Sequence, residues 1–234
     1  DAFNPFDYKA LRFAELILPK NCAIDENSVF LTARHYPFEL KASFLSTDEN
    51  TEKIKELCLH TLKYGTQETV MDCPDREKGF YLGDGCYTAL TLCVLTNDRS
   101  LFRKTVDDAL SSATISPSLL ACLDCSLIQE IAEFPLIMIN CAAEYIKITN
   151  DRKYIGSIKD ELKAVLDYYK NNYTDADGLI ARCDKWCVAE WPEKFRDNYD
   201  VKLRQNEYTE SAHCVINAYY YAAMASMNSI LGFE

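Results

Sequence analysis

Apolar residues recur at helical spacing through most of this chain from residue 46 onward, and this periodicity constrains the fold more than any other feature. The clearest stripe lies in residues 152–173, where one face is apolar and the rest is largely charged. Residues 134–143, which begin an expected helix over 134–149, are instead apolar nearly all round. A helix with one stripe is typical of an outer layer, and an all-apolar helix of an inner one. The sequence therefore predicts a mainly α fold with layered helices.

Further helices are expected over residues 85–95, 100–112 and 210–231, and another begins near residue 46. There, Ser46 and Glu49 have the spacing of a capping box. Apolar residues then follow at helical spacing: Ile54, Leu57, Cys58 and Leu62. The loops over residues 66–84 and 174–209 are too long for a simple bundle, and long loops often carry function.

The first 45 residues have a different character. Residues 38–44 alternate strictly between apolar and polar, residues 29–33 are rich in β-formers, and residues 11–18 are a third candidate strand. Three such strands make a poor independent sheet. We therefore expect residues 1–45 to be the last strands of a larger β-domain that begins outside this chain, and residues 46–234 to belong to the helical domain.

Composition narrows the classes of partner. Acidic residues outnumber basic ones by 36 to 25, so the formal charge of -11 disfavours binding to nucleic acid or an anionic membrane. A neutral sugar is indifferent to that charge.

The longest apolar runs fall far short of the ~20 residues that span a bilayer. Eleven cysteines is an odd number, and Cys58, Cys86, Cys93 and Cys141 lie at apolar-periodic positions, which favours a reducing cytoplasm over a disulfide scaffold.

The densest cluster of ionisable groups lies in residues 72–85, where one proline and three glycines predict an irregular loop. Glycosidic cleavage needs a carboxylic acid that stays protonated, and nearby carboxylates raise the pKa of such a group. Asp72 and Asp84 are placed to crowd Glu77 in this way, while Arg76 would restrain Glu77 or bind a sugar hydroxyl. The alternative is a solvated, charged loop without a chemical role.

Both tryptophans of the chain lie in residues 185–193, together with Glu190. A tryptophan face offers a flat apolar platform to the C–H face of a sugar ring, and a nearby carboxylate accepts hydrogen bonds from its hydroxyls. Packing of Trp186 and Trp191 in the core is the alternative interpretation.

The string of residues 72–84, Asp-Cys-Pro-x-Arg-Glu-Lys-x-x-Tyr-Leu-Gly-Asp, resembles the acid-bearing loop of bacterial α-L-rhamnosidases. Residues 129–134 and 186–220 also contain stretches similar to this family. Its members are six-hairpin (α/α)6 toroid glycosidases preceded by β-sandwich domains. The resemblance implies that residues 46–234 are the N-terminal portion of such a toroid, and that residues 1–45 are the terminal strands of a β-sandwich.

The resemblance also implies roles for single residues. Glu77 matches the general acid of the family. Three residues match positions that bind the rhamnose hydroxyls: Asp72, Arg76 and Asp84. Trp186 and Glu190 match an aromatic residue and an acid of the same pocket, although many relatives have Asp at the position of Glu190.

The family inverts the anomeric centre with two carboxyl groups, a chemistry that needs neither a metal nor an organic cofactor. Its catalytic base is a Glu late in the toroid, and we expect that residue to lie outside this chain. The expected partner is a rhamnosylated carbohydrate, and a half toroid would expose an apolar face that predicts self-association. The alternatives are a six-hairpin glycosidase for another sugar, and a sugar-binding or scaffold fragment without turnover.

Overall fold

The computed structural model describes residues 7–37, 39–123, 129–188, 212 and 214–232. In these residues six α-helices follow one another: α1 (Glu49–Gly65), α2 (Leu82–Thr96), α3 (Ser100–Ser111), α4 (Phe134–Thr149), α5 (Arg152–Tyr173) and α6 (Cys214–Leu231). Two short 3-10 helices, η1 (Glu26–Ser28) and η2 (Ser112–Thr114), accompany them. The prediction of a mainly α fold is confirmed.

Two helical hairpins, α2 with α3 and α4 with α5, form the centre of the molecule. The first helix of each hairpin ends at an asparagine with left-handed backbone, Asn97 (φ 58°) or Asn150 (φ 50°). Asparagine tolerates this conformation better than most residues, so the chain can turn back within a few residues. Asp151 then caps α5 by accepting the backbone N–H of Tyr154. The left-handed asparagines therefore explain why the chain reverses sharply between α2 and α3 and between α4 and α5.

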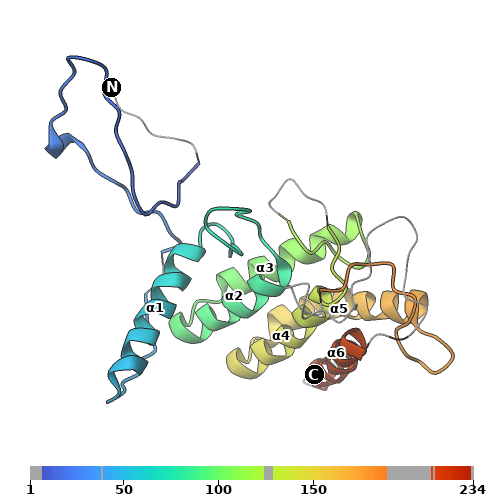
Figure 1. Ribbon diagram of the computed structural model, residues 1–234. Coiled ribbons are helices and arrows are strands. Elements are labelled where there is room, and N and C mark those ends of the chain that lie inside the picture. Colours follow the sequence, from blue (N-terminus) through green and yellow to red (C-terminus); the bar gives the residue numbers. More distant parts are fainter. Residues whose placement is uncertain (1–6, 38, 124–128, 189–211, 213, 233–234) are drawn as a thin grey trace.

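The inner and outer helices are those that the apolar pattern predicted. α4 packs against α2, α5 and α6, which places it in the middle of the helices in Figure 1. The buried residues of α4 lie on nearly all sides of the helix, whereas α5 buries a single stripe that begins at Ile155 and ends at Tyr173. Burial of apolar surface on several sides of α4 supplies much of the driving force for this arrangement.

The segment before α1 runs away from the helices for much of its length (Figure 1). Residues 7–37 and 39–48 contain no strand, although three were expected there. A strand needs a neighbour to complete its hydrogen-bond ladder, and the backbone bonds from this segment to the helical part reach only helix ends. Tyr36 donates its N–H to Thr66 O at 2.7 Å, and Lys41 and Ala42 donate to Leu95 O. The division at residue 45 stays a prediction.

α1 departs from the prediction in two ways. It begins at Glu49 rather than Ser46, because Asp48 is the N-cap and accepts the N–H of Thr51. The backbone N–H of Ser46 instead reaches Glu52 Oε1 at 2.7 Å. The expected apolar stripe is not buried, since Ile54 is 60% exposed and Leu57 is 66% exposed.

The cysteine pattern is only partly explained by packing. Cys86, Cys93 and Cys141 are buried, as a small hydrophobic side chain should be, whereas Cys58 is exposed on α1. Among the helices that the structure describes, none is long and apolar enough to cross a membrane.

Candidate active site

Residues 72–81 form an irregular loop that leads into α2, and we call it the acid loop. Its two ends are held together because Asp72 N donates to Gly79 O at 3.0 Å and Gly79 N donates to Asp72 Oδ1 at 2.9 Å. Asp72 thus uses one carboxylate oxygen to close the loop. Residues 74–77 form the turn between these ends, in which the Arg76 side chain is 74% exposed and the Glu77 side chain is 30% exposed.

Glu77 lies in a hydrogen-bonded turn with two neighbours. Its Oε1 pairs with Arg76 Nη2 at 2.5 Å, and its Oε2 accepts the thiol of Cys73 at 3.0 Å. The Glu77 N–H also points to Cys73 Sγ at 3.3 Å. The hydrogen bond from Arg76, followed by that from Cys73, lowers the pKa of Glu77 to about 2. Crowding by carboxylates was expected to raise this pKa. Instead, Asp72 also lowers it through a hydrogen bond, and only the partial desolvation of Glu77 acts in the opposite direction.

Asp84 lies in the first turn of α2, where its side chain is exposed. Surrounding protein atoms still remove part of its hydration, and this desolvation, together with the negative charge of Asp72, raises the pKa of Asp84. The environments of Asp84 and Glu77 thus push their pKa values in opposite directions, as is common among acids of active sites.

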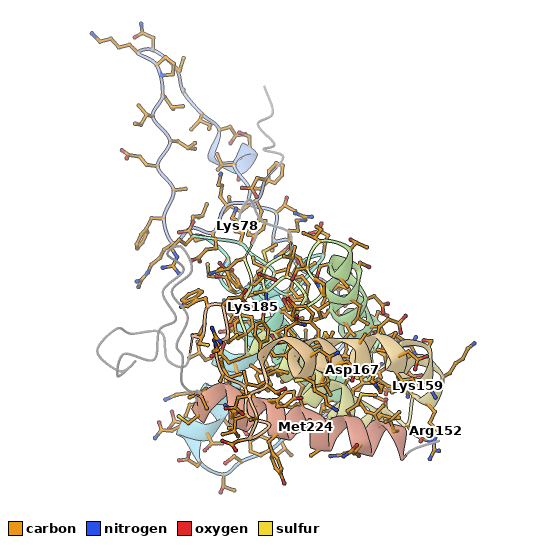
Figure 2. All side chains as sticks on the ribbon, turned by 90° about the vertical axis from the view of Figure 1, so that its right-hand side faces the viewer. Lys78, Arg152, Lys159, Asp167, Lys185 and Met224 are labelled. Atoms are coloured by element: carbon orange, nitrogen blue, oxygen red, sulfur yellow. The ribbon has the colours of Figure 1, made fainter. Side chains whose placement is uncertain are left out.

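Lys78 anchors the acid loop to the segment before α1, a role that the sequence did not reveal. Its backbone is left-handed (φ 50°), and its Nζ donates to Tyr8 O at 2.6 Å and to Asp7 Oδ2 at 2.8 Å. The same ammonium lies 4.1 Å from the centre of the Tyr8 ring. In Figure 2, Lys78 and Lys185 both lie toward the end of the helical body from which the N-terminal segment extends.

A short run of backbone hydrogen bonds connects the acid loop with the segment that contains Trp186. Leu82 N donates to Ala121 O at 2.7 Å, and Ala121 N donates to Gln129 O at 2.7 Å. Ala132 N then donates to Trp186 O at 2.9 Å. Isolated β-bridges follow the same path, including a parallel one between Ile131 and Trp186. Two sequence motifs that lie more than a hundred residues apart are therefore linked through residues 121–122 and 129–132.

The beginnings of α2 and α4 meet at this connection. A Cβ atom on Gly83 would lie 2.8 Å from Phe134 Cε1, so the first turn of α2 lies directly against the first residue of α4. Only glycine permits that approach without displacing the ring. The acid loop and the Trp186 segment consequently lie at the N-terminal ends of the inner helices.

Trp186 itself is half-buried, and its neighbour Lys185 is buried. Lys185 Nζ pairs with Glu130 Oε1 at 2.8 Å. Downstream, Val188 N donates to Glu133 Oε2 at 3.3 Å. Glu190, the other expected sugar-binding residue of this segment, lies outside the residues that the structure describes.

Asp72, Cys73 and Glu77 each offer a ligand atom, and these atoms all lie within 4.8 Å of one another. This is the set in the described residues that a metal ion could use, but the hydrogen bonds of the turn already account for its compactness.

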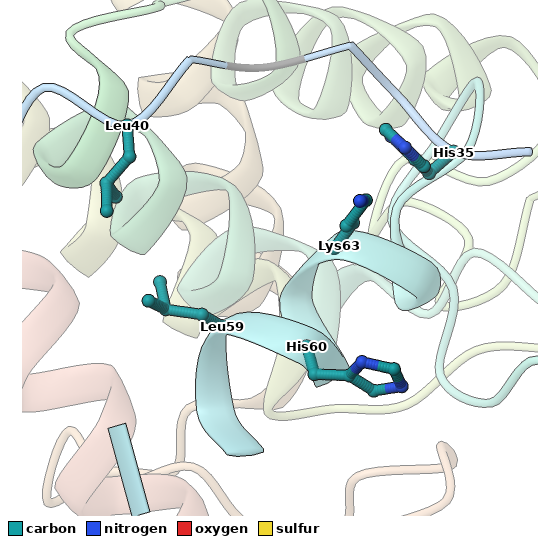
Figure 3. A pocket seen from close by; sticks show the side chains of 5 residues that line it. All are labelled: His35, Leu40, Leu59, His60 and Lys63. Atoms are coloured by element: carbon teal, nitrogen blue, oxygen red, sulfur yellow. The ribbon is translucent and has the colours of Figure 1, made fainter. Parts of the chain in front are cut away.

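A separate pocket lies between the N-terminal segment and α1, and it shares no residue with the acid loop. Figure 3 shows its lining side chains: His35, Leu40, Leu59, His60 and Lys63. A second pocket is lined by Arg103, Asp151, Lys153, Tyr154 and Ser157. Its Arg103 and Asp151 form an ion pair at 2.5 Å that joins α3 to the turn before α5. Neither pocket is lined by Glu77, Trp186 or another residue that the sequence assigned to the sugar site.

Solved structures that resemble this fold include two rhamnosidases. The GH78 family rhamnosidase of Bacillus sp. GL1 aligns with a TM-score of 0.72 at 20% identity, over 85% of this chain and 20% of the other. The rhamnosidase from Klebsiella oxytoca with rhamnose bound aligns with a TM-score of 0.55 at 16% identity, over 79% of this chain and 38% of the other. These likenesses establish the fold, and the chain spans only part of each rhamnosidase.

No curated protein matches the chain. Residues 39–232 match the bacterial alpha-L-rhamnosidase 6 hairpin glycosidase domain, which covers most of the sequence. The helical hairpins, the acid loop and this match lead to one conclusion: the chain belongs to the bacterial α-L-rhamnosidase family and carries part of its six-hairpin glycosidase domain.

Proposed function

We propose that this chain provides the acid side of a glycosidase site that releases terminal α-L-rhamnose, with Glu77 as the general acid. The observation that carries the proposal is the hydrogen-bonded connection between the acid loop and Trp186. This connection supports the proposal because the acid loop and the Trp186 segment both lie at the N-terminal ends of α2 and α4. The rhamnose bound in the Klebsiella oxytoca rhamnosidase supports a carbohydrate as the ligand.

Glu77 must gain a proton when the substrate binds, if it is to act as the general acid. A general acid must hold a proton, but the ion pair with Arg76 keeps Glu77 ionised in the free protein. The Arg76 side chain is 74% exposed, so little packing opposes its movement. In the proposed mechanism a sugar hydroxyl accepts hydrogen bonds from Arg76, the ion pair opens, and the pKa of Glu77 rises.

The remaining residues would hold the sugar. Asp72 has a second carboxylate oxygen beyond the one that closes the loop, and Asp84 is solvent-accessible at the start of α2. Both would accept hydrogen bonds from rhamnose hydroxyls, as would Glu190, while Trp186 would stack on the apolar face of the ring.

Glu77 would protonate the leaving oxygen while a water attacks from the other face and inverts the anomeric centre. The base that activates this water should lie ~6.5–9.5 Å from Glu77. We assign no residue to this role. Neither a metal nor an organic cofactor is part of the proposed chemistry.

Hydrolysis of a chromogenic α-L-rhamnoside by a complete six-hairpin domain, which supplies the base, tests the role of Glu77. Glu77→Gln keeps the shape of the side chain but cannot donate a carboxylic proton, so we expect a loss of about 10²- to 10⁴-fold in kcat. The control is Asp75→Asn, which removes an exposed charge from the same turn. Equal activity of Glu77→Gln and wild type would contradict the assignment.

The two alternatives give different results. A glycosidase for another sugar would cleave a different chromogenic glycoside and still lose activity in Glu77→Gln. A sugar-binding fragment would bind L-rhamnose in calorimetry but release no product with any variant.

We also expect copies of the chain to associate through apolar residues near α1. Leu45 is 91% exposed, and Ile54 and Leu57 of α1 are 60% and 66% exposed. Sedimentation velocity over a range of concentrations tests this expectation, and a monomer at every concentration would contradict it.

A further inference from the structure

Lys185 is buried next to the proposed sugar platform, although lysine is rarely buried. Its side chain is 5% exposed, and its ammonium lies 2.8 Å from Glu130 Oε1 and 3.9 Å from Asp184 Oδ1. The rings of Tyr168 and Tyr173 lie 5.7 and 5.9 Å from it. A buried ammonium remains charged only where such partners replace its hydration.

Glu130 is built to receive this lysine. Its Oε1 also accepts the hydroxyl of Ser118 at 2.7 Å and the hydroxyl of Ser116. Burial disfavours the charged form of Glu130, but the bonds from Lys185 and the two serines outweigh it, and the pKa of Glu130 is lowered. One carboxylate oxygen thus collects three donors from two distant segments.

This pair lies directly beside the backbone connection to Trp186. Glu130 immediately precedes Ile131, which forms the parallel bridge with Trp186, and Lys185 immediately precedes Trp186 itself. The Tyr169 hydroxyl holds the same strip by donating to Ala132 O at 2.8 Å. The segment is therefore fixed by side chains as well as by its backbone.

We propose that the Glu130–Lys185 ion pair is a positioning pair, which sets the orientation of Trp186 and thereby the affinity of the site for the sugar ring. The inference rests on the proposed function for its sugar, but the orientation of Trp186 can be measured without one. A buried ion pair often adds little net stability compared with apolar residues, and fixing a single geometry is one role that such pairs can have.

The test uses a double variant, because removing one partner leaves the other charge buried and risks unfolding. Glu130→Gln with Lys185→Met removes both charges, while the introduced amide keeps an oxygen for Ser116 and Ser118. The control is Lys163→Met with Asp167→Asn, which removes an exposed pair on α5. Circular dichroism and thermal melting establish that each variant is folded.

Two readouts follow, the NMR signal of the Trp186 indole N–H, assigned with Trp186→Phe, and the Kd for L-rhamnose. We expect the folded double variant to shift or broaden the indole signal and to weaken rhamnose binding about tenfold. The control should leave both unchanged. An unaltered indole signal in the folded double variant would overturn the proposal.

These readouts separate the two proposals. If wild type binds no rhamnose, the proposed function fails, while the indole signal still decides whether the pair positions Trp186. If rhamnose binds wild type and the double variant equally, the ion pair has no part in sugar affinity and the inference fails alone.

Discussion

The region around the N-terminal ends of α2 and α4 and the outer helix α5 contain the same residue types in opposite settings. Lys185 is 5% exposed and pairs with Glu130, whereas Lys163 on α5 is 52% exposed and pairs with Asp167. Gly85 touches a buried ring, whereas a Cβ on Gly156 in α5 would meet nothing within 4 Å. The difference teaches that burial, more than residue type, decides what a charge or a glycine does here, and it allows matched substitutions.

The largest effect is expected at the buried lysine. Lys185→Met leaves Glu130 without its main counter-charge. The Glu130 side chain is 34% exposed and keeps its serine donors, so the free energy of unfolding should fall by ~2–4 kcal/mol, less than for a fully buried charge. Lys163→Met removes an exposed partner and should change it by less than ~0.5 kcal/mol. Urea unfolding followed by circular dichroism measures both. Similar values for the two variants would show that burial does not distinguish these pairs.

Alanine substitutions at Gly85 and Gly156 should change the stability of the protein in opposite directions. A Cβ on Gly85 would lie 2.4 Å from Cε2 of Phe80, which is fully buried and cannot move away. Gly85→Ala should therefore destabilise the protein by ~1–3 kcal/mol through overpacking. Gly156→Ala should stabilise it by ~0.5–1 kcal/mol, because alanine restricts the unfolded chain and favours helix. Shifts of the same sign in the thermal midpoint would contradict the structure.

Acid should lower the stability contributed by the Glu130–Lys185 pair more than that contributed by the exposed Lys163–Asp167 pair. The pKa of Glu130 is lower in the folded protein than in the unfolded chain, so its contribution to stability is present above its ordinary pKa of ~4.3. That contribution is lost as the pH falls through the folded value, at up to ~1.4 kcal/mol per pH unit. Urea midpoints between about pH 6 and 3 should fall less steeply for Glu130→Gln with Lys185→Met than for Lys163→Met with Asp167→Asn. Parallel curves would argue against the Glu130 contribution.

The smallest effect on stability is expected at the exposed ion pair of the acid loop. Arg76→Gln should leave the free energy of unfolding nearly unchanged, because the Arg76 side chain is 74% exposed. It should nevertheless raise the pKa of Glu77 from about 2 toward the ordinary ~4.3, because the neighbouring positive charge is gone. NMR titration of the Glu77 carboxyl carbon measures this, with Asp75→Asn as a control that keeps the ion pair. A Glu77 pKa that stays near 2 in Arg76→Gln would refute the role of Arg76.

The central helices were predictable because their signals are local. The apolar stripe of α5, the all-apolar start of α4 and the Asn150-Asp151 turn between them fix both helices within a few residues of chain. The acid loop was equally visible as a cluster of charges among proline and glycine. Its chemical assignment came from its resemblance to the rhamnosidase loop.

Features that depend on the third dimension could not be predicted in this way. Glu130 and Lys185 lie 55 residues apart, and no spacing rule joins them. The pKa of Glu77 depends on which way Arg76 turns, and the exposure of the α1 stripe depends on what lies beside it. A strand likewise needs a partner that its own sequence does not specify.

The central claim is that the acid loop and the Trp186 segment form a single sugar site. Titration of the chain with L-rhamnose, followed through the backbone amides of Gly79 and Gly83 and the indole of Trp186, tests this most directly. The account predicts that all three signals shift with one Kd, while the amide of Gly156 on α5 stays in place. Shifts confined to one of the two segments, or different Kd values for the two, would contradict it.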